Sequence, residues 1–177
     1  MLRITMLDRV SLVGLFFGAG LWLLAISALA VPMKDDPNGF EGLAWGVALA
    51  ENDTFKRTED AGRLKTYELT AGPAKLGDTV VPSMKFMTID DKFARVTVRY
   101  EGKAAHEQIL AFLQAKYGPL DRTPGQFSVG PVKFYAWQGF ETEVTMRYET
   151  RSNSGIIFFE SQTLRNKLAE GNSATVF

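Results

Sequence analysis

The only imidazole in this 177-residue chain belongs to His106, and Glu107 follows it, as in a zinc-binding helix. A helical site of the form H-E-x-x-H needs a second histidine four residues on, where Leu110 stands. The chain also has no cysteine, and carboxylates alone are poor ligands for zinc or copper. We therefore predict no metal site. We expect His106 to be a packed, hydrogen-bonded core residue, because it lies on the apolar stripe of a predicted helix.

Two pairs of adjacent carboxylates, Glu59-Asp60 and Asp90-Asp91, are the remaining candidates for acid–base chemistry. Paired acids can divide the work of glycoside hydrolysis, but only across a cleft with a set separation. Asp90-Asp91 lies at a predicted hairpin turn, where aspartate is favoured for backbone reasons. The chain also lacks a G-x-S-x-G motif and a phosphate-binding G-x-x-x-x-G-K loop. We predict no catalytic residue, no cofactor and no enzymatic activity.

Aromatic side chains are the strongest candidates for binding, and they are Trp45, Tyr135 and Trp137. Trp45 stands beside glycines, and Tyr135 and Trp137 share one face of a predicted strand. If that face meets solvent, the two rings form a platform for a partner protein or a sugar ring. The alternative is core filling, which we favour because an aromatic-rich domain without disulfides needs core mass.

The clearest strand pattern lies in residues 94–100 and 143–149, where apolar and polar side chains alternate. These strands belong to the sheet that must position the candidate residues. At an offset of 48 residues, Val96-Thr97-x-Arg99-Tyr100-Glu101 matches Val144-Thr145-x-Arg147-Tyr148-Glu149, and Lys85-Phe86 matches Lys133-Phe134. Each stretch is predicted to close a β-hairpin, with turns at Asp90-Asp91 and Gln138-Gly139. The similarity is either a duplication or a chance likeness of amphipathic strands.

The best predicted helix spans residues 103–117, where apolar side chains recur at helical spacing until Gly118-Pro119 ends the pattern. Residues 64–70 and 155–159 are predicted strands, and residues 161–170 a short final helix. The order of elements predicts an α+β fold. Its antiparallel sheet is built from two β-hairpins plus extra strands, with one main amphipathic helix (103–117) packed on one face.

The first 30 residues read as a signal peptide, with Arg3 and Arg9 before an apolar run and small residues at Ala28 and Ala30. Cleavage is expected between Ala30 and Val31, which places the rest in the periplasm or outside the cell. The alternative is a retained membrane anchor that holds the domain outside the cytoplasm at the inner membrane.

Beyond this leader we predict a tether over 31–39, a single α+β domain over 40–170 and a frayed C-terminus over 171–177. The whole chain has 20 basic and 20 acidic side chains, so no positive excess attracts nucleic acid. The partner expected is another envelope protein, and a membrane is involved only if the N-terminal segment is retained.

Three short motifs combine apolar residues with glycine or tyrosine: Phe40-x-Gly42-Leu43-x-Trp45-Gly46, Leu113-x-x-Lys116-Tyr117-Gly118, and Trp137 ahead of Val144-x-Met146-x-Tyr148. Together they resemble a loose group of small exported bacterial proteins with no established activity. The resemblance implies an α+β domain and transfers no catalytic residue. The function expected is that of an exported, non-catalytic accessory or binding protein of the bacterial envelope. The alternative is a small-molecule-binding protein or a hydrolase with a pocket between helix 103–117 and the sheet.

Overall fold

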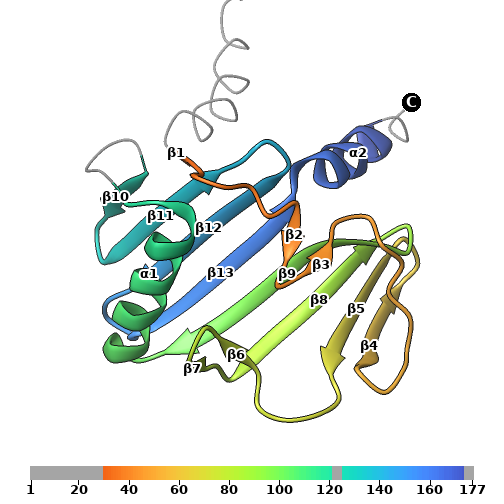
Figure 1. Ribbon diagram of the computed structural model, residues 1–177, viewed down its shortest axis with the longest axis horizontal. Helices are drawn as coiled ribbons and strands as arrows, with labels where there is room; N and C mark the ends of the chain where they lie inside the picture. Colours follow the sequence, from red (N-terminus) through yellow and green to blue (C-terminus); the bar gives the residue numbers. More distant parts are fainter. Residues whose placement is uncertain (1–29, 121–124, 174–177) are drawn as a thin grey trace, which may run out of the picture.

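The computed structural model describes residues 30–120 and 125–173. In this part of the chain a nine-stranded sheet carries helix α1 (Lys103–Tyr117) on one face and α2 (Gln162–Ser173) at one end (Figure 1). Its strands in spatial order are β1 (Val31–Pro32), β11 (Val132–Gln138), β12 (Thr142–Glu149), β13 (Ser154–Ser161), β9 (Lys92–Glu101), β8 (Ser83–Ile89), β5 (Leu64–Leu69) and β4 (Phe55–Ala61), with β10 (Gln126–Val129) also paired to β11. Two small sheets are formed by β2 (Gly39–Phe40) with β3 (Leu43–Ala44) and by β6 (Lys75–Leu76) with β7 (Thr79–Val80).

Every neighbouring pair in the large sheet is antiparallel except β1 and β11, which are parallel. β10 and β1 share the outer edge of β11, at opposite ends of that strand. After β9 the chain runs through α1 to the far edge and returns strand by strand, so that β13 lies between β12 and β9. Two strands that are distant in sequence, β9 and β12, therefore flank the same central strand.

The predicted α+β fold, with two hairpins and one main helix, is wrong. The protein is mostly β, with 50% strand and 17% helix, and its large sheet is mixed. Strand β4 is absent from the strands predicted above, and its side chains are almost all exposed. An edge strand like β4 is held by backbone pairing with β5 alone, so it needs no apolar alternation. Two-residue strands such as β1 are too short to show any period.

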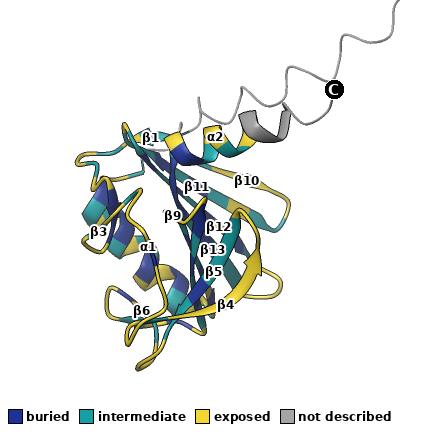
Figure 2. Ribbon diagram, turned by 90° about the vertical axis from the view of Figure 1, so that its right-hand side faces the viewer, coloured by how far each residue is buried: buried dark blue, intermediate teal, exposed yellow. Residues whose placement is uncertain are grey.

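Helix α1 spans the residues predicted for it, Lys103 to Tyr117, and buries His106, Ile109, Leu113 and Tyr117 against the sheet. Gly102 and Gly118 flank it with φ angles of 92° and 110°, which favour glycine. The core lies between α1 and the inner sides of the central strands, and exposed residues concentrate on β4 and the loops (Figure 2). The rings of Trp137, Tyr117 and Phe93 are at most 1% exposed.

The motif residues support this core. Glu41 and Gly42 have φ angles of 48° and 84°, as in the tight turn of a two-residue hairpin, and they join β2 to β3. Phe40 is buried, with its ring centroid 4.7 Å from that of Phe159. At the end of α1, the carbonyl of Gly118 accepts a 2.9 Å hydrogen bond from the indole of Trp137. The motifs are therefore explained by packing.

The ends of the domain differ from expectation. Residues 31–39, predicted as a tether, are docked on the sheet: β1 pairs with β11, and the amide of Lys34 donates to the carbonyl of Tyr117 at 3.0 Å. Backbone pairing needs no apolar side chains, so composition did not reveal it. The final helix continues to Ser173, while residues 174–177 and the leader up to residue 29 lie outside the described residues. In the described ranges, no helix is both long and apolar enough to cross a membrane.

Candidate functional site

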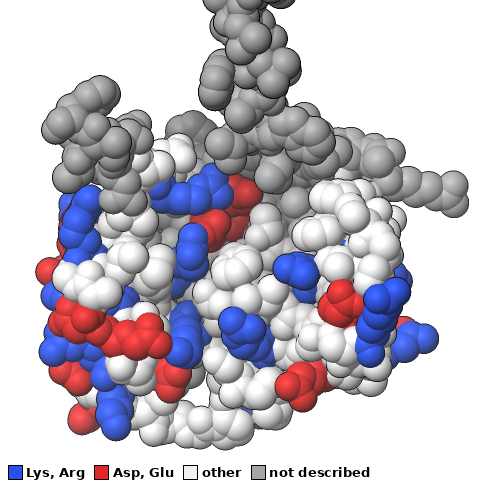
Figure 3. Space-filling model, turned by 180° about the vertical axis from the view of Figure 1, so that it is seen from behind, with Lys and Arg blue, Asp and Glu red and all other residues white. Residues whose placement is uncertain are grey.

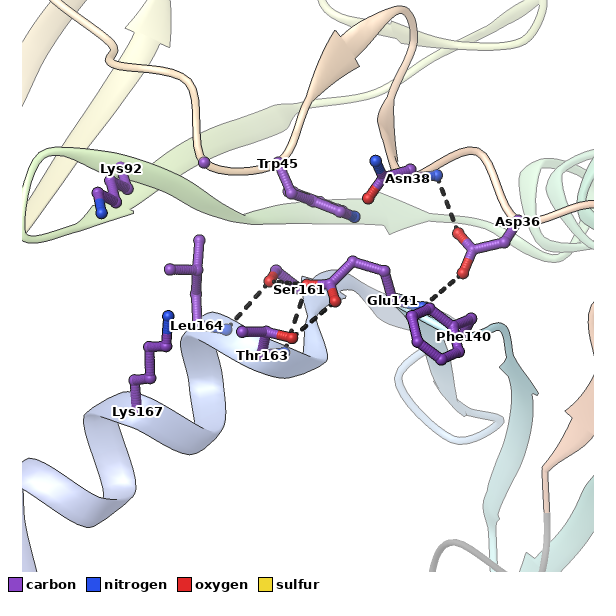
Figure 4. Close-up of a pocket in the computed structure, with 11 residues that line it drawn as sticks. Asp36, Asn38, Trp45, Lys92, Phe140, Glu141, Ser161, Thr163, Leu164 and Lys167 are labelled. Carbon is purple, nitrogen blue, oxygen red and sulfur yellow. Dashed lines mark hydrogen bonds between the residues drawn. The ribbon is translucent and has the colours of Figure 1, made fainter.

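A groove of about 530 Å³ opens where α2 begins, between the start of the domain, the loop from β11 to β12, and the first turns of α2 (Figure 4). Its lining residues are Asp36, Asn38, Trp45, Gly46, Lys92, Phe140, Glu141, Ser161, Thr163, Leu164 and Lys167. These residues come from four separate parts of the chain, which only the folded sheet brings together.

The carboxylate of Asp36 fixes the β11–β12 loop from one side. It accepts hydrogen bonds from the backbone amides of Glu141 at 2.6 Å, Thr142 at 3.1 Å and Asn38 at 2.9 Å. Burial raises the pKa of Asp36, but its hydrogen bonds to Thr142, Glu141 and Asn38 outweigh burial and hold the pKa below its usual value. A side chain at Gly139 would lie 2.4 Å from the carboxylate, so this close approach requires glycine.

The carboxylate of Glu141 fixes the loop from the other side, at the start of α2. Ser161 caps that helix by accepting a 3.1 Å hydrogen bond from the amide of Leu164, and its hydroxyl donates to Glu141. Glu141 also accepts a 2.7 Å hydrogen bond from the hydroxyl of Thr163. A negative charge at this position is favoured by the dipole of α2. The loop is thus tied to the start of the domain and to α2.

Phe140 stands at the tip of this loop with 94% of its surface exposed. Trp45 lies across the groove, half-buried, with its indole donating a 2.9 Å hydrogen bond to the hydroxyl of Thr142. Leu164 supplies an apolar wall, and Lys92 lies at the edge away from Phe140 (Figure 4). The groove therefore offers aromatic and aliphatic surface beside a cationic rim.

Of the three aromatic candidates for binding, only Trp45 lines this groove. Tyr135 and Trp137 are 6% and 0% exposed, so they are not a surface platform, and their strand face is the core face. Neither Phe140 nor Asp36 was predicted from the sequence as a site residue. A Gly-Phe-Glu turn was a usable signal, because a large aromatic at a turn has little to pack against.

His106 is 5% exposed and hydrogen-bonded, which confirms its prediction as a packed core residue. Its Nδ1 lies 2.9 Å from the hydroxyl of Tyr100 and its Nε2 lies 3.3 Å from that of Tyr135. The imidazole stacks on Tyr148, with centroids 3.9 Å apart. Burial, aided by the positive charge of Lys133, lowers the pKa of His106 to about 4, against a smaller opposing effect of Glu107.

A second hollow, of about 420 Å³, lies beside His106 between α1 and the sheet. Lys103, Lys133 and Tyr135 are among the residues that line it. This is the region in which the alternative function, a small-molecule site or a hydrolase, was expected.

The two predicted carboxylate pairs form surface ion pairs. Asp90 accepts two 2.8 Å hydrogen bonds from Arg63, whose guanidinium holds the pKa of that carboxyl below its usual value. Both aspartates have positive φ angles, as expected at a turn. The other contacts are Asp91 with Lys65, Glu59 with Lys85, and Asp60 with Arg57. Within residues 30–120 and 125–173, no three acidic or histidine side chains gather as a metal site would require.

Comparison with known proteins found no relative of this chain. No family model, curated protein or solved structure matches this chain.

Proposed function

We propose that this is an exported, non-catalytic accessory protein of the bacterial envelope that binds a partner protein through the groove beside Phe140. The observation that carries the proposal is the position of Phe140, almost fully exposed on a loop that Asp36 and Glu141 hold from two sides. A single exposed apolar side chain is ordinary on a protein surface. An aromatic fixed next to an apolar groove is the arrangement that binding hot spots use.

The groove also indicates the chemistry of the partner. Trp45 and Leu164 offer apolar contact, and Lys92 and Lys167 also line the groove, on either side of Leu164 in Figure 4. The carboxylates of Asp36 and Glu141 already accept hydrogen bonds from the protein itself. A partner segment with an apolar side chain followed by carboxylates suits this arrangement, because its charges meet the lysines.

The test is site-specific crosslinking in intact envelopes. A photoreactive phenylalanine analogue at position 140 should give a discrete crosslinked protein, and the same analogue at Val129, which is 62% exposed elsewhere, should not. Phe140→Ala should reduce co-isolation of that protein at least tenfold, and Val129→Ala should leave it unchanged. Equal yields from the two positions would contradict the proposal.

The hollow beside His106 favours a small-molecule ligand as a second candidate function. Both imidazole nitrogens are engaged by tyrosine hydroxyls, and a pKa of about 4 makes His106 a poor general base at neutral pH. Binding in this hollow should shift the NMR signals of the His106 ring. Binding in the groove beside Phe140 should leave them unchanged, so one spectrum separates the two candidates.

A further inference from the structure

We call the face of the sheet opposite α1 the open face. The two segments that match at an offset of 48 residues, 96–101 and 144–149, lie in a regular arrangement on it. Strand β13 pairs with β12 on one side and with β9 on the other, so its residues define rows across three strands. The rows that matter run Glu149–Ser154–Glu101, then Arg147–Ile156–Arg99, then Thr145–Phe158–Thr97. Equal side chains therefore stand at equal heights on both sides of β13, which the 48-residue offset did not by itself require.

The two arginines in the middle row are exposed and unpaired. Within the described residues, the guanidinium groups of Arg99 and Arg147 form no ion pair with a carboxylate within 4.0 Å. Glu101 and Glu149 likewise form no ion pair with a lysine or arginine of the described residues. By contrast, the next arginine along β9, Arg95, is paired with Glu160. Figure 3 shows this face, on which basic, acidic and uncharged side chains are all exposed.

The glutamate and arginine rows line a depression of about 540 Å³ that also includes Phe158. The side chains of Ile156 and Phe158 are only partly buried, although they lie in the central strand of the sheet. Two arginines and two glutamates give the four charged positions a net charge of zero. A polyanion would be attracted by the arginine row and repelled to a similar extent by the glutamate row, so an anionic ligand is disfavoured.

Adjacent rows of opposite charge suit a second copy of the same surface. Rotating a copy by 180° about an axis that crosses the strands at the level of Gly155 places its arginine row over the glutamate row, and its glutamate row over the arginine row. Rotation about an axis along β13 would instead oppose arginine to arginine. A two-fold interface must be self-complementary, and only the first arrangement is.

We infer that the open face is a homodimer interface in which Arg99 and Arg147 of each subunit pair with the glutamate row of the other. The axis crosses β13 near Gly155, and the sheets stack face to face with Ile156 inside the contact. Face-to-face sheets approach to about 10 Å, which lets arginine and glutamate side chains meet between them. This interface lies on a different side of the domain from the groove beside Phe140, so a dimer leaves that groove available.

The experiment measures the mass of the protein isolated from the envelope by light scattering and sedimentation, across concentration and salt. The wild-type protein should be a dimer that weakens as salt rises. Arg99→Glu with Arg147→Glu should weaken dimerisation at least about tenfold, and so should Glu101→Arg with Glu149→Arg, because each reverses four pairs in the dimer. Mixing the two variants should give a heterodimer, because their charges are then complementary.

The matched control is Lys75→Glu with Lys103→Glu, two exposed lysines on the side of the sheet that carries α1, which should leave the dimer intact. Unchanged melting temperatures show that the variants fold. A monomeric wild-type protein, or two variants that do not pair when mixed, would overturn the inference. Anion binding by the wild-type protein that is lost in Arg99→Glu with Arg147→Glu, without a heterodimer on mixing, would identify an anionic ligand instead.

Discussion

Acid should destabilise this protein through His106 in particular. The imidazole is the only one in the chain, and burial lowers its pKa from 6.5 to about 4. In the unfolded chain it returns to its ordinary pKa, so between these values the unfolded state binds more protons than the folded state. The free energy of unfolding therefore contains a contribution that is complete above pH 6.5 and is lost as the pH falls towards 4.

The size of this contribution follows from the shift in pKa. One unit of pKa corresponds to about 1.4 kcal/mol, so the loss specific to His106 should be about 2 kcal/mol at pH 5 and about 3 kcal/mol at pH 4. Hydrogen bonding does not prevent this loss, because the imidazolium would have to sit among buried tyrosines, with Lys133 close enough to oppose its charge.

Urea unfolding of the wild-type protein and of His106→Gln at pH 7.5, 6, 5 and 4.5 measures the effect. The glutamine amide can still donate and accept hydrogen bonds but does not titrate, so the pH dependence of other groups is common to both proteins. The wild type should lose about 2 kcal/mol more than the variant between pH 7.5 and pH 5. The NMR titration of the single imidazole should give a pKa well below 6.5.

Parallel pH profiles for the two proteins would refute the reasoning, and so would an imidazole that titrates near its ordinary pKa. Either result would mean that the cluster of His106 with Tyr100 and Tyr135 admits enough water to solvate a charge.

Three further predictions concern single positions. Asp36→Ala should cost about 2 kcal/mol and speed hydrogen exchange at the amide of Glu141, because it removes the acceptor that fixes the loop; unchanged exchange would count against this role. Gly155→Ala should cost about 1 to 3 kcal/mol in urea unfolding, since the new methyl carbon would lie 2.0 Å from the ring of Tyr100, and a neutral result would show that the ring can move. N-terminal sequencing of the protein from the envelope should begin at Val31, whereas Met1 on the mature form would show a retained anchor.

Periodic patterns predicted the elements that have one buried face. The alternation around Val96 and Val144 lies on strands β9 and β12, and the stripe from His106 to Tyr117 is helix α1. Short paired segments could not be predicted in this way. Strand β1 is held by backbone hydrogen bonds to β11, which leave no signature in side-chain types.

The similarity at an offset of 48 residues shows how far sequence likeness can mislead about register. Phe86 pairs with Val96, but Phe134, its match, pairs with Arg147 and so faces the other side of the sheet. A bulge in the first hairpin and a longer loop in the second account for the difference. The candidate groove was unpredictable for a related reason: Asp36, Trp45 and Phe140 meet only because the sheet is assembled across long separations in sequence.

The central position of β13 constrains when the chain can fold. Its residues, Ser154–Ser161, are the last strand to be made, yet they join the half of the sheet that ends in β9 to the half that ends in β12. Until they arrive, each half keeps a bare edge at β9 or β12, and the two halves cannot be joined into one sheet. For the exported protein that we propose, the complete sheet therefore cannot form until almost the whole length of the chain has crossed the membrane.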